Sequence, residues 1–238
     1  MTTILRFRSD MDVTLIDSMA SDDRVISAAK VSTLGAKAEA AATDDVGSSK
    51  FIDFLMTGRH GSPFEHAVFT FLITAPIFVW REFMRHRIAS YNEESGRYKQ
   101  LEPVFYVPDH TRNLVQVGKP GAYSFQPGTA AQHSQVRLIH ERTSRVAYAN
   151  YEALLQSGIA REVARLSLPL NIYSSAYVTM NARALMNFLS LRTKSDTSLF
   201  PSFPQREIEM VAEQMEEVFA AFMPVTWAAF QAKGRVAP

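Results

Sequence analysis

The segment from residue 85 to residue 98 is the most informative part of the chain, and its sequence is RHRIASYNEESGRY. It combines three arginines with serine, asparagine and tyrosine side chains, directly after an apolar stretch with helical spacing. Guanidinium groups offer planar pairs of hydrogen-bond donors that suit phosphate and carbonyl oxygens. The segment therefore predicts a pocket for an anionic ligand rather than a solvated surface.

Mixed helical and strand patterns surround this segment. Apolar residues from Ile77 to Ile88 recur at helical spacing and predict a helix from Pro76 to about Ala89. Strands are expected over 2–8, 68–73, 102–107 and 171–180. A further helix is expected after an N-cap at Asp22 or Asp23, and another from Ser48 or Ser49 to Gly58. Asn181 is expected to cap a helix over 182–193. The other expected helices cover 129–156, 159–167, 205–222 and 227–230. Turns or loops are expected over 60–66, 35–47, 108–128 and 194–204.

Strands and helices do not alternate regularly, which favours an α+β fold over a doubly wound sheet. We expect one domain over residues 1–238, with a mixed or antiparallel sheet and long helices. A length of 238 residues is sufficient for a full hydrophobic core.

Composition excludes several classes of function. The chain has no cysteine, which excludes disulfides, thiolate metal sites and a cysteine nucleophile. A formal net charge of +1 gives little overall attraction for nucleic acid, so none is expected as a partner. The longest apolar run is interrupted by Thr74 and Pro76 and is too short to span a bilayer. With no secretory signal pattern at the N-terminus, a cytoplasmic location without a membrane partner is expected.

The segment 85–98 resembles the signature R-H-R-x-x-S-x-N-x-x-S-x-R-Y of the flavin-dependent thymidylate synthases. All eight fixed positions match: Arg85, His86, Arg87, Ser90, Asn92, Ser95, Arg97 and Tyr98. The resemblance extends from about residue 28 to residue 192. Its other segments are Ala28–Ser32, the H-x-x-P-F-E-H motif at 60–66, Arg161-Glu162-x-x-Arg165, Leu168-Pro169 and the run from Asn181 to Arg192.

The resemblance implies an α+β domain that assembles as a homotetramer with active sites shared between subunits. It implies FAD as cofactor, NADPH and methylenetetrahydrofolate as co-substrates, and dUMP (2′-deoxyuridine 5′-monophosphate) as the substrate converted to thymidylate. The FAD-binding positions would be Ser32, Ser62, Glu65, Arg85, His86, Arg87, Asn181, Arg183 and Asn187, with His60 toward the flavin and folate. The dUMP-binding positions would be Glu82, Glu93, Ser95, Gly96, Arg97, Arg165 and Arg192.

Methylation of uracil at C5 requires that carbon to become nucleophilic, and an added cysteine thiolate is one route to this. Because this chain has no cysteine, a fixed cation that polarises a ring carbonyl is the alternative, and Arg192 is the candidate catalytic residue. Ser95 lacks a recognisable base to activate it and is assigned to binding.

Other interpretations stay open at this point. Asn181 is also a good helix N-cap, and Arg161 with Arg165 also fits a solvated helix face. Glu65 and His66 lack the spacing of a metal site, so no metal is predicted. After Arg192 the family's usual S-H-A-Q-W-E pattern is missing. A nucleic-acid-binding module, a flavoprotein of another activity and an inactive scaffold remain as alternatives.

Overall fold

The computed structural model describes residues 3–40, 45–119 and 122–238. Its largest sheet has the strand order β2-β3-β8-β4, formed by β2 (Asp12–Ser18), β3 (Val68–Pro76), β8 (Tyr173–Asn181) and β4 (Ser90–Glu93). Side chains of β3 alternate between buried and half-buried positions, because successive side chains of a strand point to opposite faces. Phe69, Phe71 and Ile73 form the buried row.

The chain packs as two compact units, and each unit combines three separate stretches of sequence. The first unit consists of Met1–Met11, Thr74–Glu82 and Glu93–Ala176, and the second of Asp12–Ile73, Phe83–Asn92 and Tyr177–Pro238. Neither unit is continuous in sequence, and both β3 and β8 contribute residues to both units. The predicted α+β class is confirmed.

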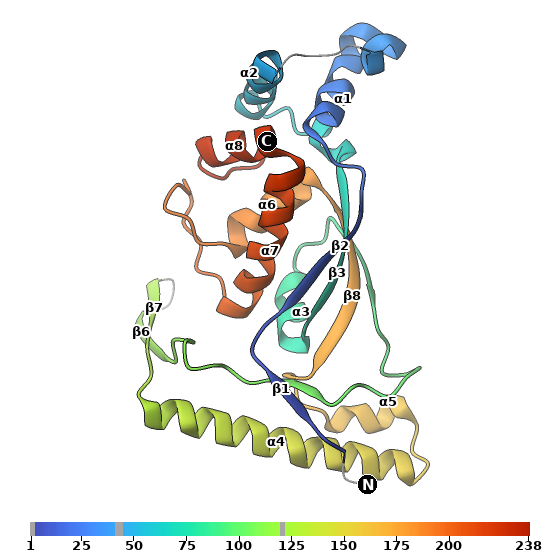
Figure 1. Ribbon diagram of the computed structural model, residues 1–238, viewed down its shortest axis with the longest axis vertical. Coiled ribbons are helices and arrows are strands. Elements are labelled where there is room, and N and C mark those ends of the chain that lie inside the picture. The colour runs from blue at the N-terminus through green and yellow to red at the C-terminus, as the bar shows by residue number, and fades with distance from the viewer. Residues whose placement is uncertain (1–2, 41–44, 120–121) are drawn as a thin grey trace. The chain divides into compact units, whose positions relative to one another are not determined.

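The core of the first unit lies between α4 (Ala130–Gln156) and a short parallel pair, β1 (Arg6–Arg8) with β5 (Val104–Tyr106) (Figure 1). Tyr148 of α4 packs edge-on against Phe105, and its hydroxyl donates to the Leu101 carbonyl over 2.9 Å. A capping box at Thr129 and Gln132 starts the helix, close to the predicted boundary. The short helix α5 (Arg161–Ala164) and a 3₁₀ turn over Arg165–Ser167 follow it.

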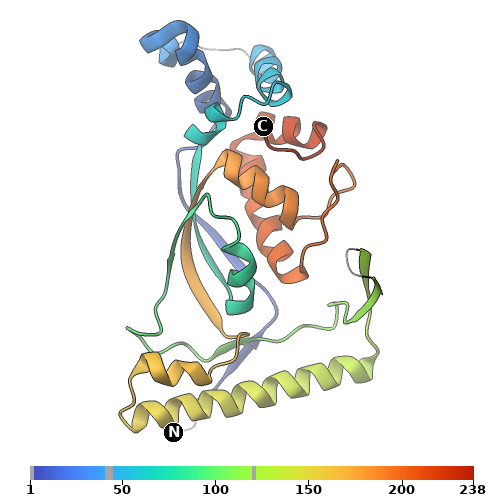
Figure 2. The same cartoon turned by 180° about the vertical axis from the view of Figure 1, so that it is seen from behind.

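Helices dominate the second unit. These are α1 (Asp22–Leu34), α2 (Asp45–Thr57), α6 (Ala182–Arg192), α7 (Arg206–Phe222) and α8 (Pro224–Ala232). The buried residues of α7 include Ile208, Val211, Met215 and Phe219, at the spacing of an amphipathic helix. Helix α7 lies alongside α6, as both views show (Figure 2).

The predicted helix from Pro76 to Ala89 is wrong at its C-terminal end. Pro76 ends β3, and the helix α3 covers only Ile77–Phe83. A tight turn replaces the helix there, because His86 N–H bonds to the Phe83 carbonyl over 3.0 Å. The Tyr91 hydroxyl then donates to the His86 carbonyl over 2.6 Å, which fixes an irregular backbone before β4. Arg85, His86 and Arg87 are therefore not on a helix.

Other boundaries also need correction. Ser21, not Asp22 or Asp23, is the N-cap of α1, and β2 had not been predicted. The expected loop 35–47 contains a 3₁₀ helix at Gly35–Ala40 and the start of α2, while residues 41–44 lie outside the described part. The expected loop 108–128 contains an antiparallel hairpin of β6 (Val115–Lys119) and β7 (Ala122–Gln126). Backbone hydrogen bonds between these strands stabilise a segment whose glycine and polar residues resemble a loop.

No helix within residues 3–40, 45–119 and 122–238 is both long enough and apolar enough to cross a membrane. In the same ranges no group of three or more His, Asp or Glu side chains is arranged to hold a metal ion.

Candidate active site

The second half of the 85–98 segment belongs to the first unit and forms a turn. The Tyr98 and Lys99 amides bond to the Ser95 carbonyl over 3.0 and 3.1 Å, and the Arg97 amide bonds to the Ser95 hydroxyl over 3.2 Å. Glu93 accepts a hydrogen bond of 2.6 Å from the Ser174 hydroxyl of β8. These contacts fix the backbone between Glu93 and Lys99 without using the guanidinium of Arg97.

Two arginines from distant parts of the sequence meet at this turn. A Cβ atom added to the buried Gly96 would lie 3.2 Å from Arg165 Cδ, so the small residue allows the Arg165 side chain to lie against the turn. Arg97 Nε donates to Glu162 Oε2 over 2.7 Å, and both side chains are about half exposed. Glu162, three residues before Arg165 in the chain, therefore holds the Arg97 side chain. Glu82, another predicted site residue of this unit, is half-buried near the end of α3.

Helix α6 carries four of the predicted site residues of the second unit. Asn181 is its N-cap, since its side-chain oxygen accepts the Ala184 amide over 2.8 Å. Arg183 and Asn187 are four residues apart on one face, and Asn187 Nδ2 donates to the Arg183 carbonyl over 3.1 Å. Arg192 is the last residue of the helix. The cap interpretation of Asn181 is confirmed, which leaves its amide group available for a further contact.

Arg183 connects α6 with the 3₁₀ turn Ser62–His66. Its Nη1 lies 2.6 Å from Glu65 Oε1, and its Nε donates to the Pro238 carbonyl over 2.7 Å. A Cβ atom on the buried Gly61 would lie 2.5 Å from the Arg183 guanidinium. Glycine is thus required at position 61 for Arg183 to lie against the turn.

His86 is the signature residue with the most specific contacts. Its Nε2 accepts a hydrogen bond of 3.0 Å from Arg192 Nε, and its ring packs edge-on against buried Phe188. Burial, together with the Arg192 charge, lowers the pKa of His86 from 6.5 to about 4. At neutral pH His86 is a neutral acceptor that orients Arg192. Arg85 and Arg87 are exposed on either side.

Replacing His86 with Gln is expected to make the FAD-free protein less sensitive to acid. Between pH 6.5 and about 4 the unfolded chain protonates this histidine while the folded chain does not, so the free energy of unfolding falls as pH decreases through this window. Glutamine does not titrate and can still accept from Arg192. Urea unfolding at several pH values measures the difference, with His140→Gln on α4 as the exposed control. If the free energy of unfolding depends on pH in the same way in wild type and His86→Gln, the low pKa assigned to His86 is contradicted.

A cavity of about 710 Å³ in the second unit brings together three more predicted residues, Ser32, His60 and Ser62. This volume is in the usual range for small-molecule pockets. The walls also include Phe51 and Phe54 of α2, and the rings of Phe54 and His60 are 5.5 Å apart. A Cβ atom on Gly58 would lie 2.8 Å from the His60 ring, so glycine leaves space for this imidazole.

Sequence reasoning did not identify Phe51, Phe54, Glu162 or Tyr91 as parts of the site. Phe51 and Phe54 lie within the helix expected from Ser48 or Ser49 to Gly58 and were given no role in the site, although Phe54 is 58% exposed. Glu162 was recognised only as a neighbour of Arg161 and Arg165, whereas it pairs with Arg97. The i, i+3 spacing of Phe51 and Phe54, which places both rings on one helix face shortly before the H-x-x-P-F-E-H segment, is the one signal that could have suggested the cavity wall.

Comparison with known proteins gives consistent matches over nearly the whole chain. The family model described as thymidylate synthase complementing protein matches residues 14–225. A flavin-dependent thymidylate synthase from Tropheryma whipplei (strain TW08/27) is 57% identical over 98% of this chain and 97% of its own length. One from Streptomyces coelicolor is 55% identical over 98% of this chain and 96% of its own length.

Solved structures agree with these relatives. A UMP/dUMP methylase, PolB from Streptomyces cacaoi, bound with 5-Br dUMP, is 54% identical with a TM-score of 0.93, and the match covers 98% of this chain and 100% of that one. The same protein bound with 5-Br UMP gives 52% identity and a TM-score of 0.91 over 98% and 99% of the two chains. Since the family model, the sequences and the fold all agree, this chain belongs to the flavin-dependent thymidylate synthase family.

Proposed function

We propose that this protein methylates C5 of dUMP reductively to give thymidylate, with methylenetetrahydrofolate as the one-carbon donor and with FAD and NADPH supplying the electrons. The family and the named relatives support the choice of substrate. The proposal depends most on the contact between a neutral His86 and the guanidinium of Arg192. Because the chain has no cysteine, this fixed cation is the group that can activate the pyrimidine.

The residues of the second unit fit a flavin dinucleotide. The aromatic and hydroxyl walls of the 710 Å³ cavity suit a flat, partly polar ring system, with Ser32, Ser62 and His60 as hydrogen-bonding groups. Arg183, held between Glu65 and the Gly61 turn, is a donor for a pyrophosphate oxygen. Asn181, Asn187, Arg85, His86 and Arg87 complete the proposed FAD set. When bound, reduced FAD supplies the reducing equivalents that convert the transferred methylene to methyl.

The residues of the first unit fit a nucleoside monophosphate. Arg97 and Arg165 provide two guanidinium groups beside the Gly96 backbone, which suits a phosphate dianion. Glu93, Ser95 and Glu82 supply polar contacts for sugar and base. Glu162 neutralises part of the positive charge of Arg97 until the phosphate arrives.

The pyrimidine is nucleophilic at C5 as an enolate, which carries negative charge on a ring carbonyl oxygen, and this charge must be stabilised until C5 attacks the methylene group and consumes it. Arg192 supplies a fixed positive charge for this oxygen, in the manner of an oxyanion site. Its orientation is preset because its Nε donates to His86 Nε2 over 3.0 Å. We assign Ser95 to binding, because its hydroxyl accepts the Arg97 amide and, among the described residues, no base lies within hydrogen-bond distance to activate it.

We further propose a homotetramer whose active sites contain residues from more than one subunit. Several large apolar side chains of the first unit are exposed on α4 and after α5: Leu138, Ile139, Val146, Leu166 and Leu170. Apolar surface of this kind is typical of protein interfaces. Native mass spectrometry should give four chains per particle, and a monomer at micromolar concentration would contradict the assembly.

UMP is a second candidate substrate. The solved relative, PolB from Streptomyces cacaoi, is named a UMP/dUMP methylase and was crystallised with bromo derivatives of both nucleotides. Competition between UMP and dUMP in one reaction measures the preference directly. A ratio of kcat/KM for dUMP over UMP near one would mean that the ribose 2′-hydroxyl is tolerated.

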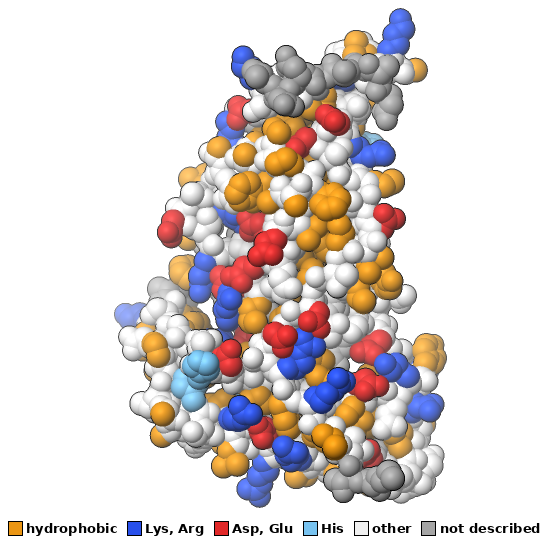
Figure 3. All heavy atoms as spheres, viewed as in Figure 1, with side chains coloured by type: hydrophobic (Ala, Val, Ile, Leu, Met, Phe, Trp, Pro, Cys, Tyr) orange, Lys and Arg blue, Asp and Glu red, His pale blue; other side chains and the backbone are white. Residues whose placement is uncertain are grey.

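The proposed function is tested by product formation. Purified protein should be yellow and should convert dUMP to thymidylate only when dUMP, NADPH and methylenetetrahydrofolate are all present. A flavoprotein of another activity or an inactive scaffold would be yellow without product. A nucleic-acid-binding module would be colourless and would bind single strands in a salt-sensitive way. The face in Figure 3 does not favour this module, because acidic and basic side chains are interspersed on it.

A further inference from the structure

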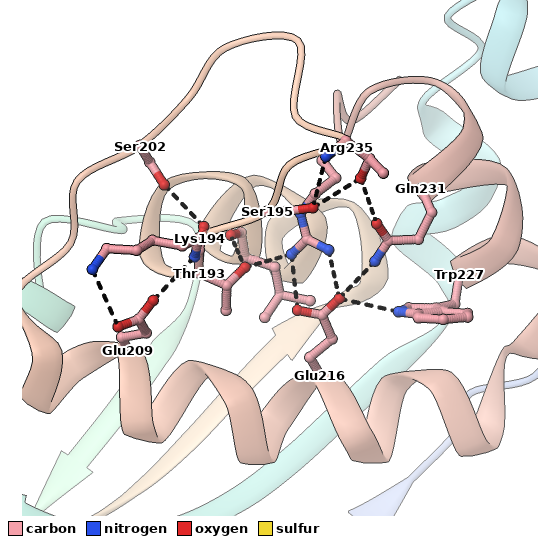
Figure 4. A network of polar contacts seen from close by, with 11 residues as sticks. Thr193, Lys194, Ser195, Ser202, Glu209, Glu216, Trp227, Gln231 and Arg235 are labelled. Atoms are coloured by element: carbon pink, nitrogen blue, oxygen red, sulfur yellow. Dashed lines mark hydrogen bonds and ion pairs between the residues drawn. The ribbon is translucent and has the colours of Figure 1, made fainter.

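The residue after Arg192 is held from several directions. Thr193 is buried at 5% exposure, and its hydroxyl donates to the Leu189 carbonyl over 2.8 Å and accepts a hydrogen bond from Arg235 Nη2. The Ser202 hydroxyl donates to the Thr193 carbonyl over 2.9 Å. The next amide, Lys194 N–H, bonds to Glu209 Oε1 of α7 over 3.2 Å. Figure 4 shows these contacts converging on the C-terminal end of α6.

Arg235 is itself fixed by a buried ion pair. Its side chain is only 3% exposed, and Nη1 and Nη2 donate to the two carboxylate oxygens of Glu216 over 2.6 and 2.8 Å. Glu216 also accepts from Trp227 Nε1 over 3.1 Å and Gln231 Nε2 over 2.9 Å (Figure 4). The Arg235 guanidinium stacks 5.0 Å from the centre of the Phe230 ring. All of these groups lie within the second unit.

Stability alone does not account for this arrangement. Burial of an Arg–Glu pair costs desolvation, and apolar replacements of similar size are often as stable. Arg235 also has a left-handed backbone with φ of 58°, which residues with a Cβ rarely adopt, and its Nε is buried without a hydrogen-bond partner among the described residues. We infer that this arrangement holds the Arg235 guanidinium in one position. From that position it donates to the Thr193 hydroxyl and so fixes Thr193.

We propose that the Glu216–Arg235 pair is a positioning device for Arg192, which acts by holding the Thr193 hydroxyl and so the last turn of α6. This inference rests on the proposed function, in which Arg192 contacts the pyrimidine. His86 orients the Arg192 side chain directly, while Arg235 fixes the backbone from which that side chain extends. Glu216 and Arg235 are thus positioning residues that do not touch the substrate.

Substitutions of Thr193 test the device with matched variants. Thr193→Val keeps the shape but loses the hydroxyl, and Thr193→Ser keeps the hydroxyl. In FAD-loaded enzyme, Thr193→Val should lower kcat/KM for dUMP by about 10- to 100-fold, as expected for a small misplacement of a catalytic group. Thr193→Ser should restore the activity to near wild type, and FAD affinity should be unchanged in both. Equal activity of the Val and Ser variants would overturn the proposal.

Glu216→Gln gives a second test, with Glu213→Gln as control. Both glutamates are on α7 and pair with arginines, but Glu213 pairs with Arg206 and is about half exposed. Activity should fall in folded Glu216→Gln and stay unchanged in Glu213→Gln. If Glu216→Gln does not fold, the Thr193 variants still decide the question.

A double-mutant cycle separates positioning from general damage. Calorimetric titration with dUMP is done on FAD-loaded wild type, Thr193→Val, Arg192→Ala and the double variant. Thr193→Val should weaken dUMP binding several-fold in the wild-type background and have no further effect when Arg192 is absent. Equal losses in both backgrounds would refute the positioning role while leaving the proposed function intact. Wild-type protein that does not bind dUMP would refute the proposed function and with it the inference.

Discussion

Arg192→Ala should reduce thymidylate formation by about 10²- to 10³-fold or more while FAD stays bound, since this is the usual effect of removing a charge-stabilising donor. The guanidinium is the one group that we assign to stabilising charge on the pyrimidine ring. Alanine removes it without touching the cavity that contains Ser32, His60 and Ser62. His86 loses its Arg192 partner but keeps its packing against Phe188. Turnover and flavin absorbance of the same sample give both quantities.

Arg137→Ala provides the control for this experiment. Arg137 is an exposed arginine of α4 that pairs with Glu141 over 2.8 Å, and its loss should leave turnover and flavin content unchanged. Retention of full activity in Arg192→Ala would remove Arg192 from the mechanism. Loss of flavin together with activity would mean that Arg192 is a structural residue of the cofactor site instead.

Arg183→Ala should weaken FAD binding by about 10- to 100-fold, the range expected for loss of hydrogen bonds to a charged group. Arg183 is preorganised between Glu65 and the Pro238 carbonyl, so little side-chain entropy is lost when it binds pyrophosphate. Titration of FAD-free protein with FAD, followed by fluorescence quenching, measures the affinity. Arg142→Ala on α4 is the exposed control.

Gly61→Ala tests the same arginine without changing any charge. The new methyl group would lie 2.5 Å from the Arg183 guanidinium and 2.7 Å from the Pro238 carbonyl, so Arg183 must move. Because φ at Gly61 is −74°, alanine brings no backbone strain, and the effect on FAD affinity is due to this displacement. Undiminished FAD affinity in both Gly61→Ala and Arg183→Ala would show that Arg183 does not hold the cofactor.

The sequence predicted best the elements whose ends depend on local chemistry. Asn181 caps α6 and Thr129 begins α4 within a residue of the expected positions, because capping side chains bond to amides only two or three residues away. The end of α3 was wrong because the Tyr91 hydroxyl, eight residues beyond Phe83, binds the carbonyl of His86 in an irregular turn. The hairpin over 115–126 was missed because each strand is only five residues long and the surrounding segment is rich in proline and glycine.

The site followed the same rule. Its residues were proposed from motifs, but the pairs that they form in the structure are distant in sequence. His86 and Arg192 are 106 residues apart, Arg97 and Glu162 are 65 apart, and Glu65 and Arg183 are 118 apart. No local pattern indicates such pairs, because only the folded chain brings them together. The low pKa of His86 and the role inferred for Arg235 therefore became visible only in the structure.

Tritium release from dUMP labelled at C5 tests most directly whether Arg192 activates the pyrimidine without a cysteine. Under anaerobic conditions, with NADPH and methylenetetrahydrofolate, wild-type enzyme should release tritium to water in step with thymidylate formation, and Arg192→Ala should release almost none although it remains yellow. Tritium release by Arg192→Ala at the wild-type rate would contradict the account.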